Sequence, residues 1–385
     1  MKHFDKRTWV EVDLDAIEYN YKTIRKRVPT SAKLCCVVKA DAYGHGAVRV
    51  ATLLKELGAD FFAVATFEEA LQLRNADIDT PILVLGYTPP IYAKQLAENN
   101  ISQCVYSSEY AAELNAEALA SGVKISVHMK LDVGMGRLGF IFTHDTEQSF
   151  DELLKACKCE SFVLEGIFTH FPCADEEKKK SSTRHQFERF YGVVSKLEGL
   201  GYSFAIRHCA NTAASLAYPE FSLDMTRAGI SLYGALPSDF IGKYITPKCT
   251  FTLKTVVTNV KTVKEGDTIG YGSRFAAPKD MRIATLPIGY ADGFLRTNAK
   301  SGTKVFIGGH PCGIVGRVCM DQTMINADDV DGISIGDEVI IFGGEGAADV
   351  HEFAKINKTI PYETLCTVGA RVPRIYKKDG VIEFV

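Results

Sequence analysis

Residues 34–46 have the sequence LCCVVKADAYGHG, in which an apolar run of strand length ends at Lys39 and a glycine-rich turn follows. A lysine placed against a core is costly, because its charge must be paired, hydrated or removed by a lowered pKa. A lysine made neutral in this way is an amine nucleophile, able to form a Schiff base with a carbonyl compound. The position alone is more typical of a lysine that extends its ammonium group to water. The surrounding sequence has to decide between these two interpretations.

Short apolar runs alternate with amphipathic helical segments beyond this stretch. The predicted strands are 34–39, 61–65, 81–86, 101–106, 124–131, 162–169, 204–208 and 223–227. Helices are predicted over 48–57, 67–75, 109–120 and 186–200, where apolar residues recur at steps of three and four. Roughly eight strand–helix units in about 200 residues favour an α/β fold, a (β/α)8 TIM-type barrel rather than an open doubly wound sheet.

The character of the sequence changes near residue 240. Residues 250–263 are rich in threonine and valine, and Gly-Asp, Gly-Gly and Asp-Gly turn signals recur from there to 379–380. We therefore predict a barrel domain over residues 1–240 and a C-terminal, mainly-β domain over 241–385. A strand predicted over 8–13 could belong to either domain, so the first residues could join the β domain.

Composition indicates an ordinary globular protein. Of the 385 residues 46% are hydrophobic and 24% charged, and the net charge of −3 gives no support to binding of nucleic acid or of a membrane surface. The charged opening leads into no signal-peptide pattern, and no apolar run approaches the ~18 residues of a membrane span. The eleven cysteines lack the spacings of zinc sites or redox dithiols. We therefore expect reduced thiols, no metal and a cytoplasmic location.

Polar residues follow the ends of the predicted strands, where barrel enzymes place their chemistry. These residues are Lys39, Lys130, Asp132, Arg137, His170, His208, Asn211, Thr212 and Arg227. Each one alone is more often structural than functional, and residues 134–139 (GMGRLG) are not the dinucleotide-binding pattern that they superficially resemble. Their joint placement at one rim indicates an active site.

A series of motifs along the chain resembles, in order, those of bacterial alanine racemases, which are fold-type III pyridoxal-phosphate enzymes. The motifs are VKADAYGHG (38–46), GMGRLG (134–139), FTHF (168–171), HCAN (208–211), MTRAGISLYG (225–234), GYG (270–272), PIGYADG (287–293), GRVCMD (316–321) and RVPR (371–374). The resemblance implies a pyridoxal 5'-phosphate-dependent isomerase that interconverts L- and D-alanine for peptidoglycan. It also implies a homodimer whose active sites are shared between subunits.

The resemblance assigns two catalytic bases. Lys39 would carry the cofactor and serve one face of the bound amino acid, and Tyr271 of the partner subunit would serve the other. Racemisation needs a base on each face, because the proton leaves one side and returns to the other. A tyrosine with an ordinary pKa of about 10 is a poor base unless a cation lowers that pKa. Arg296 is our candidate for this cation.

The resemblance also implies a set of cofactor contacts. Arg227 would face the pyridine nitrogen, where other pyridoxal enzymes usually place a carboxylate, and His208 and more distantly His170 would hold Arg227. A guanidinium does not release its proton, so the ring is a weaker electron sink and transamination is suppressed. The remaining cofactor contacts would come from Tyr43, Asn211, Thr212, Gly229 and Ile230.

For the substrate, the resemblance implies that Arg137 and the backbone at Met320 of the partner subunit bind the carboxylate, with Asp321 as support. Lys130 precedes Arg137 at a position where some relatives carry a carbamylated lysine paired with the arginine. The sequence leaves open whether Lys130 is carbamylated.

Two positions depart from the family pattern. Ala228 stands where proline is usual, and Ala370 stands where many relatives have a tyrosine that narrows the entrance to the site. A missing tyrosine suggests a wider pocket, so a racemase acting on serine or another small amino acid is an alternative. A fold-type III amino-acid decarboxylase is a less favoured alternative, because Tyr271, Met320 and Asp321 do not fit its pattern.

Overall fold

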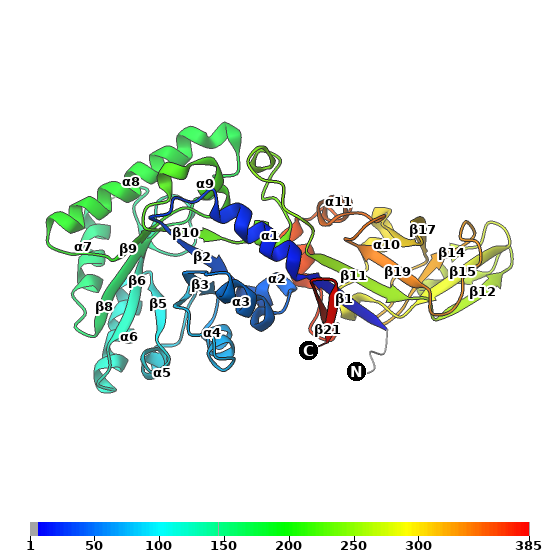
Figure 1. Ribbon diagram of the computed structural model, residues 1–385, viewed down its shortest axis with the longest axis horizontal. Helices are drawn as coiled ribbons and strands as arrows, with labels where there is room; N and C mark the ends of the chain where they lie inside the picture. Colours follow the sequence, from blue (N-terminus) through cyan, green and yellow to red (C-terminus); the bar gives the residue numbers. More distant parts are fainter. Residues whose placement is uncertain (1–6, 145, 385) are drawn as a thin grey trace.

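The computed structural model describes residues 7–144 and 146–384 of the chain. Figure 1 shows an elongated molecule, with a barrel of strands and helices at one end and a β-rich unit at the other. Within the described ranges, no helix is long and apolar enough to cross a membrane.

The barrel consists of parallel strands in the order β10-β2-β3-β4-β5-β6-β8-β9. Their bounds are β2 (Lys33–Val37), β3 (Phe61–Val64), β4 (Ile82–Val84), β5 (Ile101–Val105), β6 (Ile125–Asp132), β8 (Phe162–Phe168), β9 (Ile206–His208) and β10 (Met225–Ala228). Beside the last two strands, the Asp224 N–H donates to Arg207 O (3.1 Å) and the Arg227 N–H to Ala210 O (3.0 Å), which brings the ends of this order together. Every predicted apolar run overlaps one of these strands, so the predicted α/β barrel is confirmed.

Helices surround the barrel (Figure 1). They are α1 (Leu14–Arg25), α3 (Ala47–Glu56), α4 (Phe67–Arg74), α5 (Ala93–Glu98), α6 (Ser108–Ala120), α7 (Thr146–Cys157), α8 (Lys180–Gly199) and α9 (Thr212–Ala217). Helix α8 begins at Lys180 rather than at the predicted residue 186. The sequence pattern missed the first turns of this helix, because their residues are mostly polar and exposed and show no apolar periodicity. A short strand, β7 (Phe140–Ile141), pairs with β6.

The second unit is built on a sheet with the order β12-β15-β18-β17-β16-β19-β11-β1-β20-β21. Its strands are β1 (Thr8–Asp13), β11 (Phe251–Val256), β12 (Asn259–Val263), β15 (Met281–Leu286), β16 (Lys304–Ile307), β17 (His310–Val315), β18 (Thr323–Asn326), β19 (Glu338–Phe342), β20 (Arg374–Lys378) and β21 (Val381–Phe384). A separate pair is formed by β13 (Thr268–Ile269) and β14 (Phe275–Ala276). The helices of this unit are α10 (Asn298–Ser301), α11 (Val350–Ile356) and α12 (Pro361–Thr367).

The opening strand β1 belongs to the sheet of the second unit. It pairs antiparallel with β11, where Val10 faces Leu253, and parallel with β20, where Val10 faces Arg374. The chain then continues directly into α1 of the barrel unit, so the first residues of the chain tie the two units together.

One continuous apolar core joins the two units. It extends from barrel residues such as Leu34 and Phe62 to Leu253, Ile341 and Phe342 of the β unit, all of them buried. Burial of each such side chain contributes about 1.5–3 kcal/mol to folding, and the buried cluster extends without interruption across the junction between the units. The turn that follows β2 lies at this junction, since a Cβ added at Gly44 would lie 2.6 Å from the carbonyl oxygen of Leu365 in α12.

Candidate active site

A cavity of about 550 Å³ opens at the C-terminal ends of the barrel strands. The predicted site residues that line it are Lys39, Tyr43, Arg137, His170, Asn211, Thr212, Arg227, Gly229 and Ile230. The structure therefore brings together six of the nine residues that the strand-end pattern indicated, namely Lys39, Arg137, His170, Asn211, Thr212 and Arg227, because parallel strands of a barrel end at the same rim. His208 and Lys130 are buried and do not line this cavity.

Lys39 begins a turn, α2 (Lys39–Gly44), whose backbone is left-handed. The φ angles of Ala40, Asp41, Ala42 and Tyr43 lie between 51° and 54°. Non-glycine residues in this conformation cost roughly 1–2 kcal/mol each, so surrounding contacts must hold the turn. The Ala40 N–H donates to Glu69 Oε1 (2.6 Å), and the Ala47 N–H donates to Asp41 Oδ1 (2.7 Å). Nothing in the sequence pattern indicated this left-handed turn.

The surroundings of Lys39 favour its neutral amine over its ammonium form. Burial lowers the pKa of Lys39, the positive charge of Arg137 lowers it further, and Glu69 opposes both effects. A desolvated lysine beside another cation is an activated nucleophile and proton acceptor.

Two hydroxyl groups and a backbone amide gather at one end of the cavity. The Gly229 N–H donates to Thr212 Oγ1 at 2.7 Å. A Cβ added at Gly229 would lie 3.0 Å from the Tyr43 hydroxyl and 3.6 Å from Thr212 Oγ1, so glycine keeps this space open. Burial raises the pKa of Tyr43, which therefore stays a phenol that can donate a hydrogen bond. Such a group of donors suits a phosphate dianion.

Tyr43 is fixed from behind by a second tyrosine. Its ring stacks on Tyr233 with 4.7 Å between ring centroids, and the Tyr233 hydroxyl donates to the carbonyl oxygen of Val37 at 2.8 Å. The stacked pair thus connects the donor end of the cavity to the strand that precedes Lys39.

Arg227 is a buried cation without a carboxylate partner among the described residues. Its Nη1 donates to His208 Nδ1 (2.8 Å), and its Nη2 donates to the carbonyl oxygens of Thr169 (2.8 Å) and Cys209 (3.3 Å). Burial and the charge of Arg227 lower the pKa of His208 well below its usual value, so His208 is a neutral acceptor. The predicted support of Arg227 by His208 corresponds to a direct contact.

His170 and Asn211 shape the cavity wall. Burial, and then the charge of Arg227, lower the pKa of His170 well below its usual value. Asn211 caps helix α9, since its Oδ1 accepts from the Ala214 N–H at 3.0 Å, and its Nδ2 donates to the carbonyl oxygen of Phe171 at 3.2 Å. Among the described residues, Arg227 forms a hydrogen bond with the imidazole of His208 and not with that of His170.

Arg137 lies on a loop that one carboxylate organises. Asp132, at the end of β6, accepts from the backbone N–H groups of Gly134 (2.9 Å), Met135 (2.8 Å) and Arg137 (3.1 Å). Behind this loop, the Lys130 ammonium lies over the Phe168 ring at 4.5 Å, and burial lowers the pKa of Lys130 to about 8.

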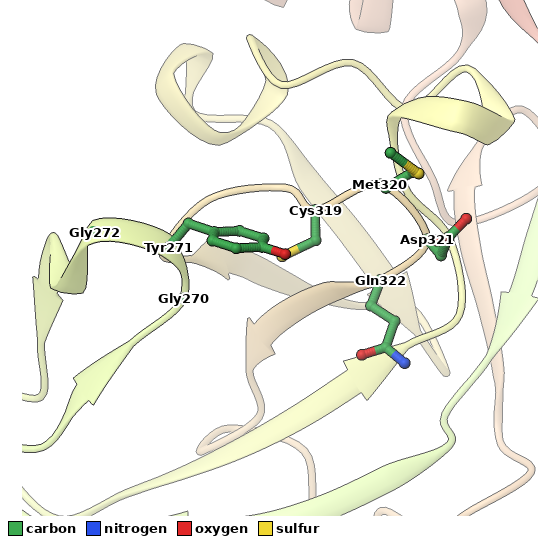
Figure 2. A pocket seen from close by; sticks show the side chains of 7 residues that line it. All are labelled: Gly270, Tyr271, Gly272, Cys319, Met320, Asp321 and Gln322. Atoms are coloured by element: carbon green, nitrogen blue, oxygen red, sulfur yellow. The ribbon is translucent and has the colours of Figure 1, made fainter.

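Tyr271, Met320 and Asp321 line a different cavity. It measures about 590 Å³, lies in the β unit and also includes Cys319 (Figure 2). Tyr271, in a short turn between β13 and β14, is 69% exposed, and Met320 is 52% exposed. Because this cavity and that of Lys39 are lined by separate sets of residues, a single chain does not place Tyr271 beside Lys39.

Arg296 lies in a third depression, which is shared with Arg274 and Arg317. It is not among the residues that line the Tyr271 cavity. The guanidinium beside the Tyr271 turn is that of Arg317, whose Nη1 would be 3.6 Å from a Cβ added at Gly272. Arg317 therefore lies next to this turn, and the role of Arg296 stays a prediction.

A buried carboxylate that the sequence analysis missed holds the Met320 loop. Asp292 accepts from Arg7 (3.0 Å) and from Arg371 (2.7 Å), and Arg371 also donates to Asp321 (2.6 Å). Close backbone contact continues the support, since the Ala291 N–H donates to the carbonyl oxygen of Met320 at 3.0 Å. These partners are far apart in sequence, so no local pattern could have indicated them.

Comparison with known protein families decides between the interpretations of the barrel cavity. Residues 12–237 match the family description "Alanine racemase, N-terminal domain", and residues 250–376 match "Alanine racemase, C-terminal domain". The chain belongs to the alanine racemase family.

Relatives in this family match over their full length. The chain is 44% identical to an alanine racemase of Desulforamulus reducens, a match that covers 96% of this chain and 98% of that protein. A solved alanine racemase structure from Clostridium difficile 630 is 40% identical, with a TM-score of 0.93 and 99% of both chains covered. Another, from Bacillus anthracis with bound L-Ala-P, is 36% identical, with a TM-score of 0.92 and coverage of 99% of this chain and 97% of that one.

The cofactor of this racemase family is pyridoxal 5'-phosphate, and the cavity residues fit it. Lys39 offers an amine of lowered pKa, and the space above Gly229, which a Cβ would fill, offers the hydroxyls of Tyr43 and Thr212 to a phosphate. Arg227 supplies a cation that has no competing carboxylate among the described residues.

The racemase cavity has one wall that the sequence analysis did not include. Tyr362 and Cys366, one turn apart on α12, line it, and the Tyr362 ring lies 6.1 Å from that of Tyr43. Ala370 is exposed and is not among the lining residues. An aromatic side chain from the segment before Ala370 therefore already occupies this side of the cavity.

Proposed function

We propose that this protein interconverts L- and D-alanine, with Lys39 and Tyr271 as the two bases. The observation that carries the proposal is the barrel cavity, where a lysine of lowered pKa, a donor cradle at Gly229 and a carboxylate-free arginine lie together. The sequence relatives are alanine racemases that match this chain over nearly their whole length, which supports alanine as the substrate.

The bound cofactor withdraws electrons from the α-carbon of the amino acid, so that its proton becomes removable. The amine of Lys39 takes this proton on one face and its ammonium form returns it, and the phenolate and phenol of Tyr271 do the same on the other face. Arg137 and the backbone at Met320 bind the substrate carboxylate, and Asp321 orients the Met320 loop through Arg371. Tyr43, Thr212, Gly229 and Ile230 hold the phosphate, with Asn211 and His170 shaping the wall.

Arg227 directs the outcome of the reaction. A guanidinium does not release its proton, so a pyridine nitrogen held by Arg227 would stay unprotonated and would draw little charge into the ring. Charge that stays at the α-carbon favours simple return of the proton over transamination. Burial lowers the pKa of Lys130 to about 8, which favours the neutral amine that a supporting role behind Arg137 would need, since two cations would repel.

We further propose that a second copy of the chain completes each site. Lys39 and Tyr271 line separate cavities of one chain, and Tyr271 and Met320 are exposed, so another subunit must bring them to Lys39. A two-fold symmetric dimer does this twice with one interface.

We place the boundary between the barrel and β domains near residue 240.

The cellular setting that we propose is the cytoplasm, where D-alanine is made for peptidoglycan. All eleven cysteines are free thiols, which is usual for proteins of a reducing compartment. The comparisons do not favour serine racemisation or decarboxylation as the main activity.

The test is steady-state racemisation of L-alanine and L-serine by the purified protein loaded with pyridoxal 5'-phosphate. We expect alanine to be turned over with the higher kcat/KM, and the substitution Lys39→Ala to lower kcat by about a thousandfold or more. Absence of D-alanine formation by the unsubstituted protein, or full activity of Lys39→Ala, would contradict the proposal. If serine were turned over with an equal or higher kcat/KM, alanine would not be the main substrate.

A further inference from the structure

A chain of hydrogen bonds runs through the barrel interior from Arg227 to Glu165. Arg227 Nη1 lies 2.8 Å from His208 Nδ1, and His208 Nε2 lies 2.8 Å from His128 Nδ1. His128 Nε2 lies 3.0 Å from Glu165 Oε2, which also accepts from the Ser102 hydroxyl. Both histidines are fully buried, whereas the Glu165 side chain is 27% exposed and borders a separate depression. The chain therefore links the cofactor cavity to a different surface of the barrel.

The two ends of this chain determine where its protons lie. An arginine side chain can only donate hydrogen bonds, and an ionised carboxylate can only accept them. His208 must therefore accept at Nδ1 and donate from Nε2–H, and His128 must do the same toward Glu165. Both imidazoles are neutral and have the same tautomer, and every bond points from Arg227 toward Glu165.

The packing around the histidines is built for this arrangement. A Cβ added at Gly166 would lie 2.3 Å from His128 Nδ1, so glycine leaves the space that the imidazole occupies. Phe168 stacks on His208 with 4.7 Å between centroids, and Phe61 meets His128 edge-on at 5.9 Å. Neither ring can turn without displacing these neighbours.

We propose that His128 and Glu165 are positioning residues, which hold Arg227 through His208 and supply its balancing negative charge from a distance. The proposal rests on the proposed function, in which Arg227 faces the pyridine nitrogen. A carboxylate in direct contact with Arg227 would bring negative charge to that nitrogen and favour its protonation. Two neutral imidazoles keep the carboxylate of Glu165 away from the cofactor while they fix the guanidinium.

The first test reads the tautomers directly. Nitrogen-15 NMR of the full-length protein, with and without pyridoxal 5'-phosphate, should show Nε2–H and unprotonated Nδ1 in both His128 and His208 near neutral pH. An Nδ1–H tautomer of His208, or a cationic form of either ring, would overturn the proposal. This measurement does not depend on racemase activity, so it separates the proposal from a failure of the proposed function.

The second test uses Glu165→Gln and His128→Phe, with the surface variant Glu220→Gln as the matched control, because Glu220 forms an exposed ion pair with Arg184. His128→Phe should lower kcat roughly 10–100-fold with little change in KM, as loss of outer-shell partners usually does. It should also shift the absorption band of the bound cofactor and raise the pyruvate released per alanine racemised. Glu165→Gln keeps an acceptor but removes the charge, so it should shift the same readouts less.

The result that would overturn the proposal is a wild-type absorption band and a wild-type pyruvate ratio in both variants. If His128→Phe fails to fold, Glu165→Gln and the tautomer measurement decide between the outcomes. Glu165→Gln should fold, because the Glu165 side chain is partly exposed. If the unsubstituted protein does not racemise alanine, the proposed function fails, and the tautomers still report on the hydrogen-bonded chain.

Discussion

At the scale of single residues, the cavity concentrates positive charge. Lys39, Arg137 and Arg227 all line it, and the acidic side chain among its lining residues is Asp175. Burial lowers the pKa of Lys39, and the charge of Arg137, which does not lose its proton in proteins, lowers it further. The same positive field attracts the phosphate of the cofactor and the carboxylate of the substrate.

A buried histidine beside the lysine turn makes stability depend on pH. His45 contacts the carbonyl oxygen of Tyr43 through Nδ1 (3.1 Å) and the Thr250 hydroxyl through Nε2 (2.8 Å), and burial lowers its pKa to about 3. The unfolded chain, with a histidine pKa of about 6.5, binds more protons than the folded protein between these values. Its contribution to stability is therefore complete above pH ~6.5 and is lost as the pH falls toward 3.

We expect His45→Gln to weaken this pH dependence. Between pH ~6.5 and ~4 the free energy of unfolding of the unsubstituted protein should fall by up to ~1.4 kcal/mol per pH unit more steeply than that of the variant. Urea unfolding at a fixed protein concentration across this range measures both slopes. Parallel slopes would show that His45 does not carry the effect.

The residues at strand ends were predictable, and those that act across the fold were not. Lys39, Arg137 and Arg227 each follow an apolar run, and barrel geometry brings such positions to one rim. His128 and Asp292 carry no such signal, because their partners are far away along the chain. Sequence periodicity reports which face of an element is buried, and it does not report which distant side chain meets it.

At the scale of elements, the left-handed turn at 40–43 departs most from local preference. Alanine, aspartate and tyrosine all favour other backbone conformations, so the sequence predicted an ordinary glycine-rich turn there. The contacts from Glu69 and the packing of Gly44 against Leu365 override this preference. Tertiary contacts of this kind are outside the reach of a local pattern, whereas the regular strands and most helices were within it.

Replacement of Ala40 by glycine tests the strain in this turn. Ala40 is exposed, so Ala40→Gly relieves the left-handed cost with little loss of packing, and we expect a gain of about 0.5–1 kcal/mol in the free energy of unfolding. The matched control is Ala116→Gly in the exposed face of the right-handed helix α6, which should lose about 1 kcal/mol. Urea unfolding measures both, and a loss of stability in Ala40→Gly would contradict the account.

Removal of the charge at Asp292 tests the support of the Met320 loop. Asp292 is a buried carboxylate paired with Arg7 and Arg371, so Asp292→Asn should lower the free energy of unfolding by up to about 5 kcal/mol. We also expect a KM for alanine raised by about tenfold, since in the proposed mechanism the Met320 loop binds the substrate carboxylate. The control Asp321→Asn removes only the exposed bridge to Arg371 and should cost less than ~1 kcal/mol. Equal effects of the two variants would contradict a special role for Asp292.

At the scale of the whole molecule, the two proposed bases lie on different units of the chain. Lys39 lines the cavity at the rim of the barrel, and Tyr271 lies in the turn that precedes β14. Figure 1 shows β14 in the part of the β unit that points away from the barrel. The change in sequence character near residue 240 was sufficient to predict two units. It could not predict the distance between Lys39 and Tyr271, which depends on how β1, β11 and the shared core join the units.

The central claim is that Lys39 of one subunit acts with Tyr271 of the other. The most direct measurement is racemisation by a purified mixed dimer, obtained by co-expression of differently tagged Lys39→Ala and Tyr271→Phe chains. In such a dimer one site has both bases and the other has neither, so we predict about half of the activity of the unsubstituted dimer. Each substituted homodimer should have far lower activity than the mixed dimer. A mixed dimer no more active than the two homodimers would contradict the claim.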